Sequence, residues 1–204
     1  LSPLQEAGIP VAATPGNHDA SAYGPFREER EIYERLWKEW KPSLEYVDDA
    51  GYPLHYAFTL GGALFVSIDA TQVGALPEGQ MEWMEGLPWA ENSVVFGHMP
   101  LYPFAQGRER EYIGSGDLES LWREAGVDLY VSGHHHSYYP GERDGLGLVS
   151  TACLGSGPRR LIGSESDASK ALLRFGLDSA GLTGLEAFIA PHFVETIERR
   201  TLPV

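Results

Sequence analysis

Cysteine is almost absent from this sequence. Cys153 is the single cysteine among 204 residues, so a disulfide within the chain is excluded and cysteine pairing indicates nothing about the redox compartment. We interpret Cys153 as a small buried apolar side chain, because free cysteine is among the most buried residue types.

Long apolar runs and a surplus of positive charge are absent as well. No apolar stretch approaches the roughly 20 residues of a membrane-spanning helix, so we expect a soluble domain and slightly favour the cytoplasm as its location. The chain has 29 acidic and 15 basic residues, which gives a formal net charge of −14. This balance argues against nucleic acid as a partner, because phosphate backbones bind basic surfaces. The oligomeric state is not indicated.

What the sequence does contain is the composition and patterning of a globular α/β domain. Hydrophobic residues make up 43% of the chain, which is typical of a folded protein. Apolar spacing predicts a helix over 25–40 whose broad apolar face, with its aromatic side chains, packs in the core. Gly61-Gly62 predicts the turn of a hairpin. Further helices are expected at 80–87 and 118–125, and further strands at 9–13, 94–96, 127–131, 148–152, 171–177 and 185–189. Strands that alternate with helices, followed by strands alone, predict a mixed sheet and then antiparallel pairing.

Three predicted strands end in the same way. VAATPGNHD, VVFGHMP and LYVSGHHH each consist of an apolar run, a glycine and a histidine or Asn-His pair. In α/β sheets ligands bind beyond the carboxyl ends of the strands, and the glycines permit a sharp turn there. One histidine after a strand is more often structural than a ligand. Three such endings predict a shared polar site of Asn17, His18, His98, His134 and His136.

The segment SGHHHSYY at 132–139 contains three consecutive histidines. In an extended segment side chains alternate, so His134 and His136 are expected on one side and His135 on the other. His134 and His136 are therefore the pair that could serve neighbouring metal ions. His135 is expected to face solvent or a packing partner.

The three motifs together resemble one enzyme family. GNHD at 16–19, GH at 97–98 and GHxH at 133–136 resemble the calcineurin-like metallophosphoesterases. HMPLY at 98–102 and the tyrosines after the histidines look like the purple acid phosphatase branch. The resemblance implies an α/β fold, an αββα sandwich of two mixed β-sheets flanked by helices, formed as a single domain by residues 1–204.

The resemblance also implies a dinuclear metal centre. Asn17, His98 and His134 would bind one metal and His136 the other. The two ions, manganese, iron or zinc by their nitrogen and oxygen ligands, would share a hydroxide and bind the phosphoryl oxygens.

Further residues take roles by the same resemblance. His18 would assist the leaving group and Asp19 would orient its imidazole. Tyr138 could contact the substrate, a small phosphomonoester or possibly a phosphodiester. Arg108, Arg110, Arg159 and Arg160 either reach a phosphate or carboxylate of the substrate or belong to a solvated surface.

The family's remaining ligands come from D-x-H and G-D motifs that precede GNHD. The residues before Gly16 include neither aspartate nor histidine. We therefore expect the bridging ligands to come from N-terminal strands upstream of residue 1. The alternative is a non-catalytic metal-binding or protein-interaction scaffold that retains the fold.

Overall fold

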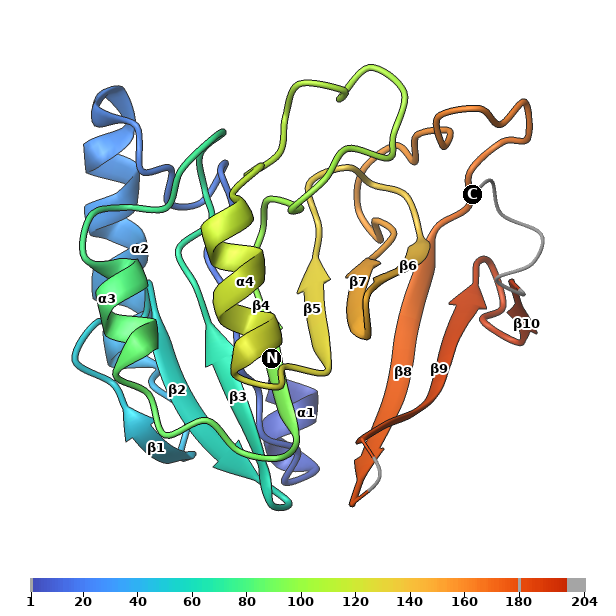
Figure 1. The fold of residues 1–204 in the computed structure, drawn as a ribbon. Helices are drawn as coiled ribbons and strands as arrows, with labels where there is room; N and C mark the ends of the chain where they lie inside the picture. Colours follow the sequence, from blue (N-terminus) through green and yellow to red (C-terminus); the bar gives the residue numbers. More distant parts are fainter. Residues whose placement is uncertain (1, 180, 198–204) are drawn as a thin grey trace.

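Two β-sheets form the framework of the protein (Figure 1). This computed structural model describes residues 2–179 and 181–197. The larger sheet has seven strands in the order β1-β2-β3-β4-β5-β7-β6, and the smaller has the order β10-β9-β8. The strands of the larger sheet are β1 (Glu45–Asp48), β2 (Tyr56–Leu60), β3 (Ala63–Ser67), β4 (Ser93–Phe96), β5 (Leu129–Ser132), β6 (Tyr139–Arg143) and β7 (Leu146–Ser150).

The larger sheet is mixed, which confirms the predicted α/β architecture. Strands β3, β4, β5 and β7 pair in parallel, and the outer pairs are antiparallel. Because β4 and β5 run in parallel with Phe96 beside Val131, their carboxyl ends lie next to one another. The pairing continues past the strands, where Gly133 N–H donates to His98 O at 2.9 Å. The GH and GHxH motifs therefore leave the sheet side by side.

Alternate side chains of this sheet serve two different cores. On one face Leu64, Val66, Val95 and Tyr130 pack with α3 (Gln80–Glu85) and α4 (Gly116–Glu124). Figure 1 shows α4 lying across this face. On the other face Val94, Leu129 and Val149 pack against Ala171 and Ala187 of the smaller sheet. Because successive side chains of a strand point to opposite faces of the sheet, the same strands contribute to both cores.

The smaller sheet consists of β8 (Ala171–Asp178), β9 (Gly181–Ile189) and β10 (Glu195–Thr196). All its described pairings are antiparallel, whereas a mixed second sheet was expected. The reason is connectivity: β8 and β9 follow one another through a short turn, and a short connection can join only antiparallel strands.

One predicted strand is absent from the structure. Residues 9–13 form no strand; the Tyr56 hydroxyl accepts from Ala13 N–H at 3.0 Å and donates to Ala13 O at 2.7 Å. One side chain thus satisfies the backbone groups that a neighbouring strand would otherwise bind.

The N-terminal helices follow the predicted pattern only in part. The expected helix over 25–40 is present as η1 (Gly24–Phe26) and α2 (Arg27–Glu39), after a short α1 (Ser2–Glu6). Its apolar side was expected in the core, yet no residue of α2 is buried and Ile32 is 44% exposed. Trp37 does pack against the cluster around Tyr56. The periodicity predicts the helix correctly but not how deeply it packs.

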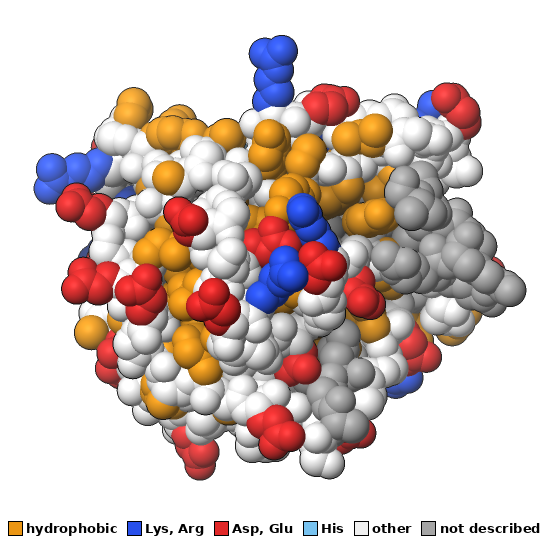
Figure 2. Space-filling model, viewed as in Figure 1, with side chains coloured by type: hydrophobic (Ala, Val, Ile, Leu, Met, Phe, Trp, Pro, Cys, Tyr) orange, Lys and Arg blue, Asp and Glu red, His pale blue; other side chains and the backbone are white. Residues whose placement is uncertain are grey.

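The surface agrees with the charge balance of the sequence. The face in Figure 2 carries more acidic than basic side chains, with apolar side chains between them. Within the part of the chain that the structure describes, no helix is long and apolar enough to cross a membrane.

Candidate metal centre

Three of the four predicted metal ligands meet beyond the carboxyl ends of β4 and β5. His98 Nε2 lies 2.6 Å from Asn17 Oδ1 and 3.1 Å from His134 Nδ1. These residues are 81 and 36 positions apart in sequence, so tertiary folding alone brings them together. The point of convergence is formed by one amide oxygen and two imidazole nitrogens.

This donor set fits a divalent cation. Two ligand atoms each about 2.1 Å from a metal and at a right angle to one another are about 3.0 Å apart, close to the separations observed here. Imidazole nitrogen and amide oxygen suit zinc, iron and manganese. Among residues 2–179 and 181–197, no group of three or more His, Cys, Asp or Glu side chains could hold a metal ion. The set therefore includes an amide, that of Asn17, beside its two histidines.

A buried ion pair fixes the loop that carries Asn17. Arg30 of α2 pairs with Asp69, which is 1% exposed, and donates to Ala20 O at 2.7 Å. Asp69 also accepts from the Thr71 hydroxyl, which in turn accepts from Ala22 N–H. The turn after Asn17 is therefore tied to the sheet beside β3.

The motif glycines do not form left-handed turns, and at two of them, Gly16 and Gly97, a side chain has little space. Gly16, Gly97 and Gly133 are not among the residues with positive φ. A Cβ on Gly16 would lie 2.7 Å from Asp19 Oδ2 and 3.4 Å from His98 Nδ1. A side chain there would displace the Asp19 carboxylate and touch the His98 ring.

The GHHH segment is not extended, and each of its three histidines has its own set of contacts. His134 and His136 have φ of 56° and 55°, in the left-handed region that costs a residue with a Cβ roughly 1–2 kcal/mol. His134 is 8% exposed, and His135 is fully buried against Phe104 at a ring separation of 4.4 Å. His135 is thus a packing residue. His136 is partly exposed, and its Nδ1 lies 3.1 Å from Gly157 O.

Glu111 is a member of the site that sequence reasoning missed. Its Oε2 lies 2.6 Å from His134 Nε2, its backbone carbonyl lies 2.8 Å from His135 Nε2, and Arg108 pairs with its Oε1. Burial opposes ionisation of Glu111, but hydrogen bonds from Arg108 and His134 outweigh it, so its pKa is below its ordinary value. No motif marks Glu111; its only sequence signal is an acidic side chain in the loop after HMPLY.

The imidazoles of the site are held neutral. Burial, followed by the neighbouring imidazoles of His134, His136 and His18, lowers the pKa of His98 to about 3. Burial also lowers the pKa of His134, although Glu111 acts in the opposite direction. Neutral imidazoles keep the lone pairs with which histidine binds metals.

The remaining predicted catalytic residues lie on the exposed side. His18 and Asp19 are both exposed, and His18 contributes to lowering the pKa of His98 and His136 after the effect of burial. Among the hydrogen bonds of the described residues, none joins the His18 and Asp19 side chains; the Asp19 carboxylate is instead directed back toward Gly16.

Tyr138 is placed differently from the other candidates. Its side chain is 6% exposed and belongs to the apolar cluster of Val94, Leu129 and Ala187 between the two sheets. The prediction that it contacts substrate is not supported by this position. Tyr138 is close to His136 in sequence, but the chain there already turns into β6.

Two arginines flank the histidines. Arg159 N–H donates to His136 O at 3.2 Å, and burial together with the charge of Arg108 lowers the pKa of Arg159. Arg108 Nε and Arg159 Nη1 are buried and without a hydrogen-bond partner. Arg110 is exposed, and Arg160 pairs with Asp167.

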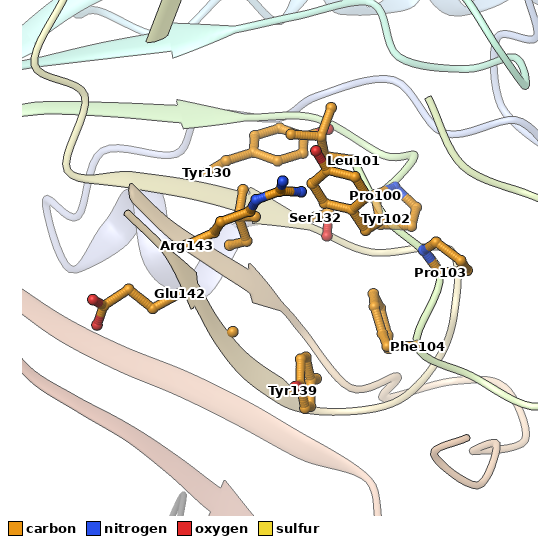
Figure 3. A pocket seen from close by; sticks show the side chains of 12 residues that line it. Pro100, Leu101, Tyr102, Pro103, Phe104, Tyr130, Ser132, Tyr139, Glu142 and Arg143 are labelled. Carbon is orange, nitrogen blue, oxygen red and sulfur yellow. The ribbon is translucent and has the colours of Figure 1, made fainter. Parts of the chain in front are cut away.

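A cavity of about 310 Å³ adjoins the loop that follows His98 (Figure 3). Tyr102, Phe104, Tyr130 and Tyr139 contribute aromatic rings to its wall, and Arg143 projects toward the Tyr102 ring at 5.1 Å. The Phe104 ring stacks on Tyr139 and also touches His135. The cavity therefore lies behind the histidine cluster and contains none of its predicted ligands.

A match to a family model identifies the family of this chain. The model of the calcineurin-like phosphoesterases matches residues 1–138, which include all three motifs. The chain belongs to the calcineurin-like phosphoesterase family. Members of this family generally use divalent metal ions.

Curated proteins and one solved structure are similar to this chain. Serine/threonine-protein phosphatase CPPED1 is 26% identical in Homo sapiens and 28% identical in Danio rerio, over 74% and 72% of this chain. The chain spans about half the length of these relatives, 49% and 48%. The solved structure of GAP50, the anchor in the inner membrane complex of Plasmodium, is 20% identical over 73% of this chain and 56% of its own, with a TM-score of 0.37.

Proposed function

We propose that this chain forms the histidine side of the active site of a metal-dependent phosphatase. The substrate is a phosphomonoester, with phosphodiesters as a lesser alternative. The observation that carries the proposal is that Asn17 Oδ1 and His134 Nδ1 lie 2.6 and 3.1 Å from His98 Nε2. Membership of the calcineurin-like phosphoesterases and the likeness to proteins named serine/threonine-protein phosphatases support it.

The metal ligands divide between two ions. Asn17, His98 and His134 hold one, and His136 belongs to the other. His136 Nδ1 is turned to the Gly157 carbonyl, which leaves Nε2 as the nitrogen with the lone pair. Bound divalent cations supply Lewis-acid charge that stabilises the transferring phosphoryl group. Their identity is manganese, iron or zinc.

The exposed residues act on the substrate. His18 protonates or stabilises the leaving-group oxygen, and Asp19 orients its imidazole as the substrate binds. Arg108 and Arg159 add positive charge beside His136, which favours a doubly charged phosphomonoester over a singly charged diester. Nucleic acid is disfavoured as a substrate by the net charge of −14.

The test is hydrolysis of an aryl phosphate and of its bis-ester with Mn²⁺ added. We expect release of the aryl alcohol from the monoester, loss of activity with a chelator, and a loss in His98→Ala larger than the roughly 10–100-fold effect of removing an outer-shell partner. His192→Ala removes an exposed histidine that lies outside the motifs and serves as the matched control. Binding of Mn²⁺ without turnover of either ester would contradict the proposal and favour the non-catalytic scaffold.

A further inference from the structure

Glu111 lies on a loop between β4 and α4 that is anchored on both sides of it. Glu111 N–H donates to Arg108 O at 3.0 Å, and Ile113 N–H donates to Pro100 O at 2.9 Å. Ile113 is only 3% exposed and belongs to the main apolar core. A side chain carried by such a backbone is held in position before any ligand arrives.

The three oxygens of Glu111 have three different partners. Oε2 contacts His134 Nε2 at 2.6 Å, Oε1 pairs with Arg108, and the backbone carbonyl contacts His135 Nε2 at 2.8 Å. A carboxylate and a carbonyl can only accept hydrogen bonds. The nitrogen that faces each oxygen must therefore carry the proton, so both imidazoles are protonated on Nε2.

The tautomer of His134 decides which of its nitrogens can bind a cation. A neutral imidazole has one N–H and one lone pair, so a proton on Nε2 leaves the lone pair on Nδ1. Nδ1 is the atom that lies 3.1 Å from His98 Nε2, on the side of Asn17. With the opposite tautomer, the N–H would point at the place where the lone pair is needed.

We infer that Glu111 is a positioning residue of this centre: it holds His134 as the Nε2–H tautomer and presents Nδ1 to the point shared with His98 and Asn17. Arg108 fixes the second carboxylate oxygen and so sets the plane of the carboxylate. The effect on metal affinity rests on the proposed function. The tautomer does not, because it is a property of the metal-free chain.

The direct measurement is the tautomer of His134 by imidazole ¹⁵N–¹H correlation NMR of the metal-free protein. We expect the Nε2–H form in the wild type and a mixture containing Nδ1–H in Glu111→Ala. Glu109→Ala is the matched control, because Glu109 is an exposed carboxylate on the same loop that accepts from Gly107 N–H at 2.8 Å. Glu111→Gln keeps an oxygen that can accept from His134 but loses the ion pair with Arg108, and we expect an intermediate shift.

Mn²⁺ titration by calorimetry is the second readout. Loss of an outer-shell partner typically costs 10–100-fold in affinity, and we expect a loss of about this size in Glu111→Ala and none in Glu109→Ala. An Nδ1–H tautomer in the wild type, or an unchanged tautomer and affinity in Glu111→Ala, overturns the inference. A wild-type chain that binds no Mn²⁺ yet shows the tautomer change upholds the inference and contradicts the proposed function. If circular dichroism shows that Glu111→Ala does not fold, the tautomer and the Mn²⁺ affinity are measured in Glu111→Gln instead.

Discussion

The two sides of the histidine cluster are built differently. On the buried side His98 and His134 contact one another, Asn17 and Glu111 at 2.6–3.1 Å. On the exposed side, the contact described for the His136 ring nitrogens is with the Gly157 carbonyl, and His18 is exposed. The buried side is thus assembled by contacts between loops, whereas the exposed side is directed toward solvent.

Under the proposed function, this difference predicts separate roles for the two sides. Side chains that are held by packing and hydrogen bonds lose little freedom when a cation binds, so the buried side is suited to selecting the metal. An exposed imidazole can reach a substrate that arrives from solvent. The comparison therefore predicts that substitutions on the two sides change different measured quantities.

The largest expected effect is on turnover, from the exposed side. Loss of a general acid typically costs 10²–10⁴-fold, and we expect His18→Asn to lower kcat by about this factor while leaving Mn²⁺ affinity unchanged. Activity on an aryl phosphate and calorimetric titration measure the two quantities. A parallel loss of metal affinity would show that the two sides are not separable.

A smaller effect, on stability, is expected from the buried side. Burial lowers the pKa of His135 to about 4, against about 6.5 in an unfolded chain. Between these values the unfolded state binds more protons, so the unfolding free energy increases with pH. The contribution of His135 to the unfolding free energy is complete above pH ~6.5 and is lost as the pH falls through about 4. It amounts to a few kcal/mol, at ~1.4 kcal/mol per pKa unit.

Urea unfolding of the metal-free chain at pH 4.5 and at pH 7 measures this difference. Burial lowers the pKa of His135, and both of its ring nitrogens already have partners. Nε2 faces the Glu111 carbonyl, and Nδ1 accepts from Phe104 N–H at 3.5 Å. A second proton would lie on Nδ1, where it has no acceptor. His135→Gln should show a weaker pH dependence than the wild type, and His192→Ala the same dependence. If the unfolding free energy changes equally with pH in all three proteins, His135 is not the source of the pH dependence.

The smallest effect on catalysis is expected at Tyr138. Since its ring lies in the apolar cluster between the sheets, Tyr138→Phe keeps the packing, and we expect KM for an aryl phosphate to remain unchanged. Tyr138→Ala should destabilise the fold by about 3–5 kcal/mol, as large-to-small changes at buried aromatic residues do. A clear rise in KM for Tyr138→Phe would contradict this expectation and show that Tyr138 contacts the substrate.

Much of the framework could be predicted from local patterns. The helix over 25–40 and the Gly61-Gly62 hairpin were predicted correctly, because periodicity and turn residues act within a few positions. β6 was missed since its sequence, YPGER, combines proline, glycine and charge, and it forms a strand only because β7 lies beside it. The apolar side of α2 was wrongly assigned to the core, because periodicity does not report what packs against a helix.

The sequence by itself determined the chemistry available to the site: an amide and imidazoles, each placed directly after a run of apolar residues. Only the tertiary structure decided which atoms face one another. Glu111 reaches His134 across 23 residues, and the His135 ring packs on Phe104 between two residues of left-handed backbone, His134 and His136. Such contacts depend on the path of loops packed against a completed sheet, and that path is set by long-range packing that no local pattern encodes.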